Sequence, residues 1–152
     1  MNMRNIKYIA VHCTAGRQSQ TIGDLRLEFK RKGWKNPGYH YVVSADGKIT
    51  QMLDESLVSN GVKGFNSVSI NVAYIGGINK DGKGVDNRTE EQKKGLRTLL
   101  KALHAKYPKA VIQGHRDFSP DKNHNGVIEP CEWIKLCPCF NAREEYKDIQ
   151  NS

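Results

Sequence analysis

The sequence predicts one α/β domain, spanning residues 1–152, in which helices flank a central mixed β-sheet. Three observations support this prediction. Short apolar runs rich in β-branched or aromatic residues alternate with longer segments whose apolar residues recur at helical spacing. Turn sequences separate these segments. A chain of 152 residues is long enough to bury one core and short for two ordinary domains.

The first third of the chain predicts a strand, a helix and a β-hairpin. Residues 6–13 are a short apolar run typical of a buried strand. Thr21 can cap a helix that continues to Lys32, and Gly33 is its expected stop. An Asp-Gly turn then separates two β-like segments, 39–44 and 48–52, which are expected to pair as a hairpin.

The remainder predicts a strand over 67–75 and a helix over 89–107, which opens with a Thr-x-x-Gln capping box. A short strand over 110–113 follows this helix. A long loop is expected as far as Pro138, and a closing helix from Asn141 onward. The hairpin and the alternation of strands with helices together favour a mixed sheet.

The formal net charge of +8 favours anionic partners, of which nucleic acid and the bacterial cell wall are the two considered. Basic residues are interspersed with acidic ones, and no nucleic-acid-binding motif occurs, so nucleic acid is not an expected partner. A solvated basic surface is the simpler interpretation of this charge. The apolar run 8–11 is far too short for a signal peptide or a membrane span. We therefore expect cytoplasmic synthesis and no membrane association.

Four cysteines occur, at Cys13, Cys131, Cys137 and Cys139. An even number allows disulfides. In a reducing cytoplasm, however, thiols are more often catalytic or metal-binding. Three of the four fall within nine positions, beside a segment that carries a histidine, and this clustering favours a metal site over disulfides.

Two histidines follow predicted strands. His12 ends the first strand, and His115 comes directly after the strand 110–113. If the two strands are parallel neighbours, both imidazoles lie at the carboxyl edge of the sheet, where ligand sites gather. Cys137 lies in a loop that can return to this edge. Two imidazoles and one thiolate are a typical protein set for a catalytic zinc ion. Taken singly, each residue is more simply a packed or hydrogen-bonded core residue.

Four short phrases occur in a characteristic order: VHCTA (11–15), GYHY (38–41), GHRD (114–117) and KLCPCF (135–140). With these phrases the chain resembles the zinc-dependent N-acetylmuramoyl-L-alanine amidases that share a fold with peptidoglycan-recognition proteins, especially short phage endolysins. The resemblance runs over most of the chain. It implies a peptidoglycan-recognition-protein-like fold around a zinc site.

The resemblance also assigns roles by position. It implies that His12, His115 and Cys137 bind zinc, and that Tyr39 and Lys135 are catalytic. Amide hydrolysis requires an activated water and stabilisation of a developing oxyanion, which a phenol and an ammonium group can both provide. Without the resemblance, Tyr39 is more simply a packed aromatic residue and Lys135 a solvated charge.

The implied activity is hydrolysis of the amide that joins N-acetylmuramic acid to L-alanine of the peptidoglycan stem peptide. The expected setting is a phage or prophage endolysin that acts on the wall after release, as a monomer. A bacterial wall-recycling enzyme and a secreted antibacterial effector are the alternative settings, which the sequence does not separate. The alternative is a non-catalytic peptidoglycan-binding module on the same fold. Recognition-only relatives typically lose the cysteine ligand, whereas Cys137, Tyr39 and Lys135 are all present here.

Other histidines and cysteines receive structural interpretations. His40 is expected on the face opposite Tyr39, as a structural residue or one that supports a ligand. Cys13 is expected to pack, and His104 to be solvated. Cys139 stands where the family usually has a small residue, and it makes the ligand assignment in this loop ambiguous by two positions.

Residues 121–132 match the spacing of an EF-hand calcium loop, with candidate ligands Asp121, Asn123, Asn125 and Glu132. A proline before the loop and another inside it argue against the usual flanking helices. The alternative is an Asn/Gly-rich surface loop without bound metal. If calcium binds, millimolar calcium should raise the melting temperature, and Glu132→Gln with Asp121→Asn should abolish that increase.

Overall fold

The computed structural model describes residues 5–62, 64–119 and 137–152. Within these residues one five-stranded sheet has the order β3-β2-β4-β1-β5. Its strands are β1 (Tyr8–Cys13), β2 (Tyr41–Val43), β3 (Ile49–Gln51), β4 (Ser69–Tyr74) and β5 (Val111–Gly114). The β2–β3 hairpin is antiparallel and all other neighbours are parallel. The predicted mixed α/β fold is therefore confirmed.

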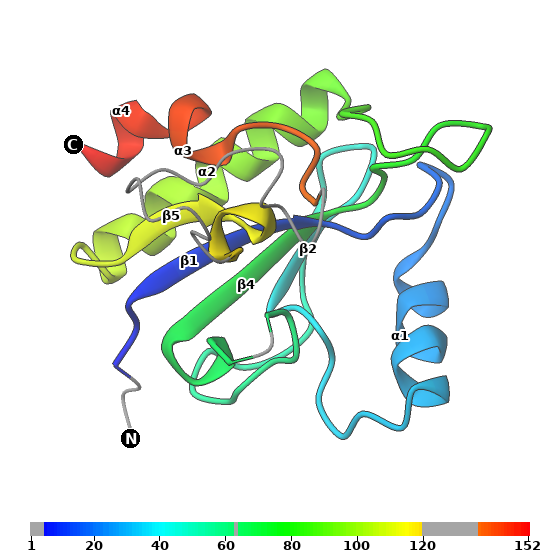
Figure 1. The fold of residues 1–152 in the computed structure, drawn as a ribbon, viewed down its shortest axis with the longest axis horizontal. Coiled ribbons are helices and arrows are strands. Elements are labelled where there is room, and N and C mark those ends of the chain that lie inside the picture. Colours follow the sequence, from blue (N-terminus) through cyan, green and yellow to red (C-terminus); the bar gives the residue numbers. More distant parts are fainter. Residues whose placement is uncertain (1–4, 63, 120–136) are drawn as a thin grey trace.

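Helices cover both faces of this sheet. Figure 1 shows α1 on its own, apart from α2, α3 and α4. Their bounds are α1 (Ile22–Arg31), α2 (Glu90–Lys106), α3 (Ala142–Glu145) and α4 (Lys147–Gln150), with short 3-10 turns η1 (Asn66–Val68) and η2 (His115–Phe118). The predicted caps are confirmed: Thr21 and Thr89 each form a capping box at a helix start.

Alternation along the strands divides the core in two. Val43 faces the larger core beneath α2, α3 and α4, and its neighbour Val42 faces the smaller core beneath α1. In β1, Cys13 belongs to the larger core. His12 therefore points to the α1 side of the sheet.

The C-terminal segment differs from the single closing helix that we predicted. The chain leaves helical geometry at Tyr146, between α3 and α4. The Tyr146 side chain is completely buried, packs its ring edge-on against Phe140, and accepts a hydrogen bond from Arg88. These tertiary contacts override local helix propensity. The predicted loop after β5 also begins with a 3-10 turn, η2.

The expectation that His104 is solvated is wrong. Its side chain is buried in α2. His104 lies one turn after Leu100 and therefore continues the buried stripe of the helix, although Lys101 and Lys106 flank it in sequence. Among the described residues its Nε2 has no hydrogen-bond partner. Charged neighbours in sequence were a poorer guide to burial here than helical spacing.

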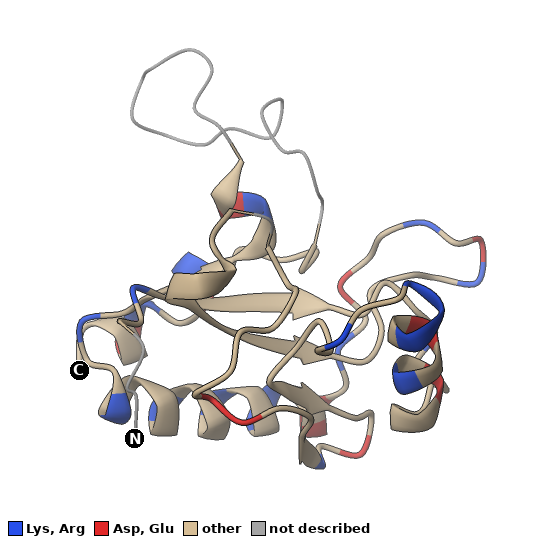
Figure 2. Ribbon diagram, turned by 90° about the horizontal axis from the view of Figure 1, so that it is seen from below, with Lys and Arg blue, Asp and Glu red and all other residues tan. Residues whose placement is uncertain are grey.

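The distribution of charge agrees with the sequence. Figure 2 shows Lys and Arg positions spread over the helices and loops, with Asp and Glu positions between them. Within the described part of the chain, no helix is both long enough and apolar enough to cross a membrane.

Candidate metal centre

Strand pairing brings the two predicted histidines together. β1 and β5 are parallel neighbours, with Val11 opposite Gly114. His12 follows at the end of β1, and His115 begins η2 directly after β5. Their rings meet at the carboxyl edge of the sheet, with centroids 4.9 Å apart and planes inclined by 67°.

Cys137 reaches the same edge from the C-terminal loop. Its Sγ accepts a hydrogen bond from the backbone N–H of Cys13 at 3.0 Å, and its carbonyl accepts one from Arg116 at 2.9 Å. The loop packs closely on the end of β5, where a Cβ on Gly114 would lie 2.6 Å from Cδ of Pro138. A residue larger than glycine at position 114 would therefore displace the loop that carries Cys137.

The ligand atoms of His12, His115 and Cys137 all lie within 4.8 Å of one another. Two imidazole nitrogens and one sulfur that converge in this way fit a zinc ion, which prefers nitrogen and sulfur ligands in tetrahedral geometry. The three residues line one cavity of about 470 Å³. A water or substrate atom can therefore reach the position that the protein leaves open.

His12 is held in the state that binds metal. It is buried, and its Nε2 lies 2.8 Å from Oδ1 of Asn71. Burial lowers the pKa of His12 to about 4, and the hydrogen bond with Asn71 opposes part of this effect. The ring is therefore neutral at physiological pH and has a nitrogen lone pair to donate.

This lowered pKa predicts a pH dependence of stability in the metal-free protein. The unfolded chain protonates His12 below about pH 6.5, whereas the folded protein does so only below about pH 4. Stability should therefore fall as the pH is lowered from 6.5 to 4, by up to roughly 3 kcal/mol. Urea denaturation of metal-free wild type and His12→Asn across this range measures the effect. Equal pH slopes in both proteins would contradict it.

The neighbouring cysteines, Cys13 and Cys139, do not belong to the three-residue cluster. The Cys13 thiol is buried in the larger core, and its hydrogen bond with Cys137 contributes most to raising its pKa to about 12. The Cys139 thiol donates to the carbonyl of Gly77 at 3.5 Å, and its pKa is raised, mainly by its hydrogen bond with Cys13. The packing role expected for Cys13 is confirmed. Among the described cysteines, Cys137 is the one in the three-residue cluster.

Tyr39 lines the same cavity, just before β2. Its ring centroid is 5.3 Å from that of His12, and its hydroxyl donates to the carbonyl of Cys13 at 3.3 Å. Burial raises the pKa of Tyr39 well above its usual value, so the phenol keeps its proton and remains a hydrogen-bond donor. A donor in this position can turn from a backbone carbonyl to a bound substrate oxygen.

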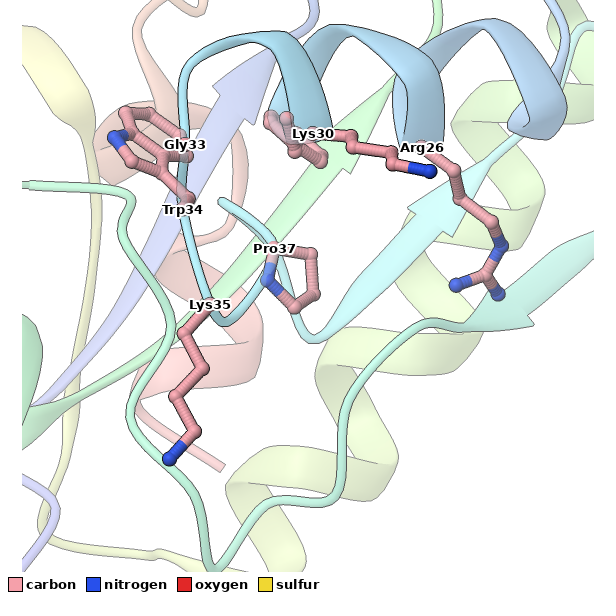
Figure 3. Close-up of a pocket in the computed structure, with 7 residues that line it drawn as sticks. Arg26, Lys30, Gly33, Trp34, Lys35 and Pro37 are labelled. Carbon is pink, nitrogen blue, oxygen red and sulfur yellow. The ribbon is translucent and has the colours of Figure 1, made fainter.

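Helix α1 forms one wall of the cavity through Glu28, Phe29 and Lys32, and Trp34 follows it. A second groove, of about 430 Å³, shares Phe29 and Trp34 with the cavity. Figure 3 shows Arg26 and Lys30 extending from α1 above this groove. The groove is lined by Arg26, Phe29, Lys30, Gly33, Trp34, Lys35 and Pro37, a set with three cationic side chains and no acidic one.

The remaining predicted site residues lie outside the described residues. These are Lys135 and the candidate calcium ligands Asp121, Asn123, Asn125 and Glu132. Sequence reasoning also overlooked Asn71, which contacts His12. The available signal was a lone amide side chain within the otherwise apolar strand core 70–74. A buried polar residue requires hydrogen-bond partners, so this amide indicated a specific contact.

A His/His/Cys cluster in an open cavity, at the carboxyl edge of the sheet, is typical of zinc hydrolases. A sequence profile of N-acetylmuramoyl-L-alanine amidases matches residues 2–127. The chain is also 36% identical over 137 residues to the endolysin of Escherichia phage T7, covering 89% of this chain and 82% of that protein. The chain therefore belongs to the N-acetylmuramoyl-L-alanine amidase family and is an enzyme that degrades peptidoglycan.

Solved structures agree with this assignment. The endolysin amidase LysCS from Clostridium intestinale superimposes with a TM-score of 0.75 at 25% identity, covering 97% of this chain and 85% of that one. The bumblebee recognition protein PGRP-SA gives a TM-score of 0.70 at 13% identity, covering 96% and 83%. The second likeness shows a shared fold, as the sequence resemblance implied.

Proposed function

We propose that the protein is a zinc-dependent amidase that cleaves the bond between the lactyl group of N-acetylmuramic acid and L-alanine of the stem peptide. The main support is the convergence of His12, His115 and Cys137 in the cavity that Tyr39 also lines. Membership of the amidase family supports the choice of bond.

His12, His115 and Cys137 would hold the zinc. When bound, zinc would polarise the scissile carbonyl and lower the pKa of a water molecule towards ~7. Tyr39, kept protonated by burial, would donate a hydrogen bond to the oxyanion that develops during attack. Lys135, placed in this role by its position in the sequence motif, would add a positive charge. No residue forms a covalent intermediate in this mechanism.

The surroundings of the site suit an anionic polymer. Arg26, Lys30 and Lys35 line the groove beside the cavity, and the whole chain carries a net charge of +8. These charges would attract the anionic cell wall. Because the T7 relative is named an endolysin, we propose that this protein also acts at lysis, as a monomer, after release from the cytoplasm.

Metal depletion and restoration test the zinc requirement. We expect the purified protein to contain about one zinc per chain and to clear a suspension of peptidoglycan. A strong chelator should remove both the metal and the activity, and added zinc should restore both. Full activity in protein shown to contain no metal would contradict the proposed zinc dependence.

A further inference from the structure

We propose that Asn71 is a positioning residue for His12. It belongs to a buried chain of hydrogen bonds, the relay Asn71–Ser59–His40, in which two backbone groups determine which atoms donate and which accept. The relay holds the His12 proton on Nε2 and presents Nδ1 to the metal. This inference rests on the proposed metal site. Asn71 and Ser59 lie outside the four motif phrases, and the inference can be tested in the metal-free protein.

The side chains of the relay are buried and contact His12 through its Nε2. Asn71, Ser59 and His40 have no solvent exposure, and His12 is 1% exposed. Asn71, Ser59 and His40 are not among the residues that line the cavity. Water is therefore excluded from these groups, and their hydrogen bonds must be satisfied among themselves or by the backbone.

The donor and acceptor roles in the relay are determined first at His40. The backbone N–H of Asn71 lies 3.0 Å from Nδ1 of His40. A backbone amide can only donate, so Nδ1 of His40 carries no proton. The ring proton is then on Nε2, which donates to the carbonyl of Leu57 at 2.8 Å. Two backbone groups, one a donor and one an acceptor, thus determine a single neutral form of His40.

Ser59 links His40 to Asn71, and its hydroxyl determines which end of the Asn71 amide faces it. Its hydroxyl oxygen lies 3.1 Å from the same unprotonated Nδ1 of His40, so the hydroxyl donates there. The Ser59 oxygen is then an acceptor for Nδ2 of Asn71, at 2.7 Å. If the Asn71 amide were rotated by 180°, its oxygen would need the hydroxyl proton that His40 already receives. The relay therefore selects one orientation of the amide.

In that orientation Oδ1 of Asn71 faces Nε2 of His12, 2.8 Å away. An amide oxygen only accepts, so His12 carries its proton on Nε2 and its lone pair on Nδ1. Hydrogen bonds to the second ring nitrogen commonly fix the form and orientation of metal-binding histidines. Asn71 serves here as that partner.

Packing holds the amide in place. A Cβ built on Gly61 would lie 2.3 Å from Cγ of Asn71, so the amide rests directly against the backbone at Gly61. A buried amide costs free energy unless it is hydrogen-bonded. An apolar residue would fill this strand position without that requirement, so the amide has a role beyond filling space.

The test compares wild type with Asn71→Leu, which matches the side chain in size but cannot accept a hydrogen bond. Nitrogen NMR of the metal-free proteins reports which ring nitrogen of His12 is protonated. We expect His12 to carry its proton on Nε2 in wild type, and to be a mixture of the Nε2–H and Nδ1–H tautomers in Asn71→Leu. Competition with a chelator should show zinc affinity reduced about 10- to 100-fold in the variant.

Two further variants separate positioning from general destabilisation. Val72→Ala removes core packing on the opposite face of β4. It should leave both the tautomer of His12 and the zinc affinity unchanged. Asn71→Asp keeps an acceptor and should retain the Nε2–H form. If Asn71→Leu does not fold, Ser59→Ala is the milder substitute. It should produce a smaller fraction of the Nδ1–H tautomer of His12.

An Nδ1–H form of His12 in wild type, or equal zinc affinity in wild type and Asn71→Leu, would overturn the proposal. These outcomes are distinct from failure of the proposed function. A wild type that binds no zinc would contradict the metal site, whereas the His12 form is measured without metal.

Discussion

Cys137→Ser should lose most of the bound zinc and nearly all amidase activity, whereas Cys139→Ser should retain both. A neutral hydroxyl is a poor substitute for a thiolate ligand. In the structure Cys137 belongs to the cluster with His12 and His115, while the Cys139 thiol donates to Gly77. Zinc content and initial rates of peptidoglycan clearing measure the two effects.

The two substitutions are matched controls for each other, because they make the same chemical change two positions apart in one loop. Loss of zinc in Cys139→Ser with retention in Cys137→Ser would show that the ligand assignment is displaced by two residues. Equal retention in both variants would show that zinc binding requires neither Cys137 nor Cys139.

Tyr39→Phe and Lys135→Ala should each keep zinc at wild-type stoichiometry while turnover falls about 100-fold or more, the scale of losing one oxyanion donor. For Tyr39 the expectation follows from its place in the cavity and from the raised pKa that keeps it protonated. For Lys135 it follows from the sequence motif alone. Metal analysis and steady-state rates on the same preparations separate chemistry from metal binding.

Tyr41 offers a matched control for the loss of a phenol hydroxyl. It lies in β2, two residues after Tyr39, and its hydroxyl donates to Glu55 rather than facing the cavity. Tyr41→Phe should therefore leave turnover close to that of wild type. Loss of zinc in Tyr39→Phe or Lys135→Ala would contradict their proposed roles, and so would near-normal turnover in both.

The sequence was sufficient to predict most of the fold and the meeting of the two histidines. Capping boxes, an Asp-Gly turn and apolar runs are local signals, and they located α1, α2 and the hairpin. His12 and His115 could be placed together because parallel strands present their carboxyl ends at one edge. This step required only that β1 and β5 be neighbours.

Other features depended on tertiary contacts that no local pattern records. The break at Tyr146 follows from its burial against Phe140, and the burial of His104 from its place on the α2 stripe. Cys137 and Cys139 are nearly equivalent in sequence, and only the loop geometry distinguishes their surroundings. The partnership of Asn71 with His12 joins residues 59 positions apart.

The most direct test of the central claim is the identity of the reaction products. Purified peptidoglycan digested with the zinc-loaded protein should release stem peptides that begin with a free L-alanine amino group, detected by mass spectrometry and amino-terminal labelling. The glycan strands should gain no new reducing ends. New reducing ends, or cleavage within the stem peptide while the N-acetylmuramic acid–L-alanine bond stays intact, would contradict the proposed amidase activity.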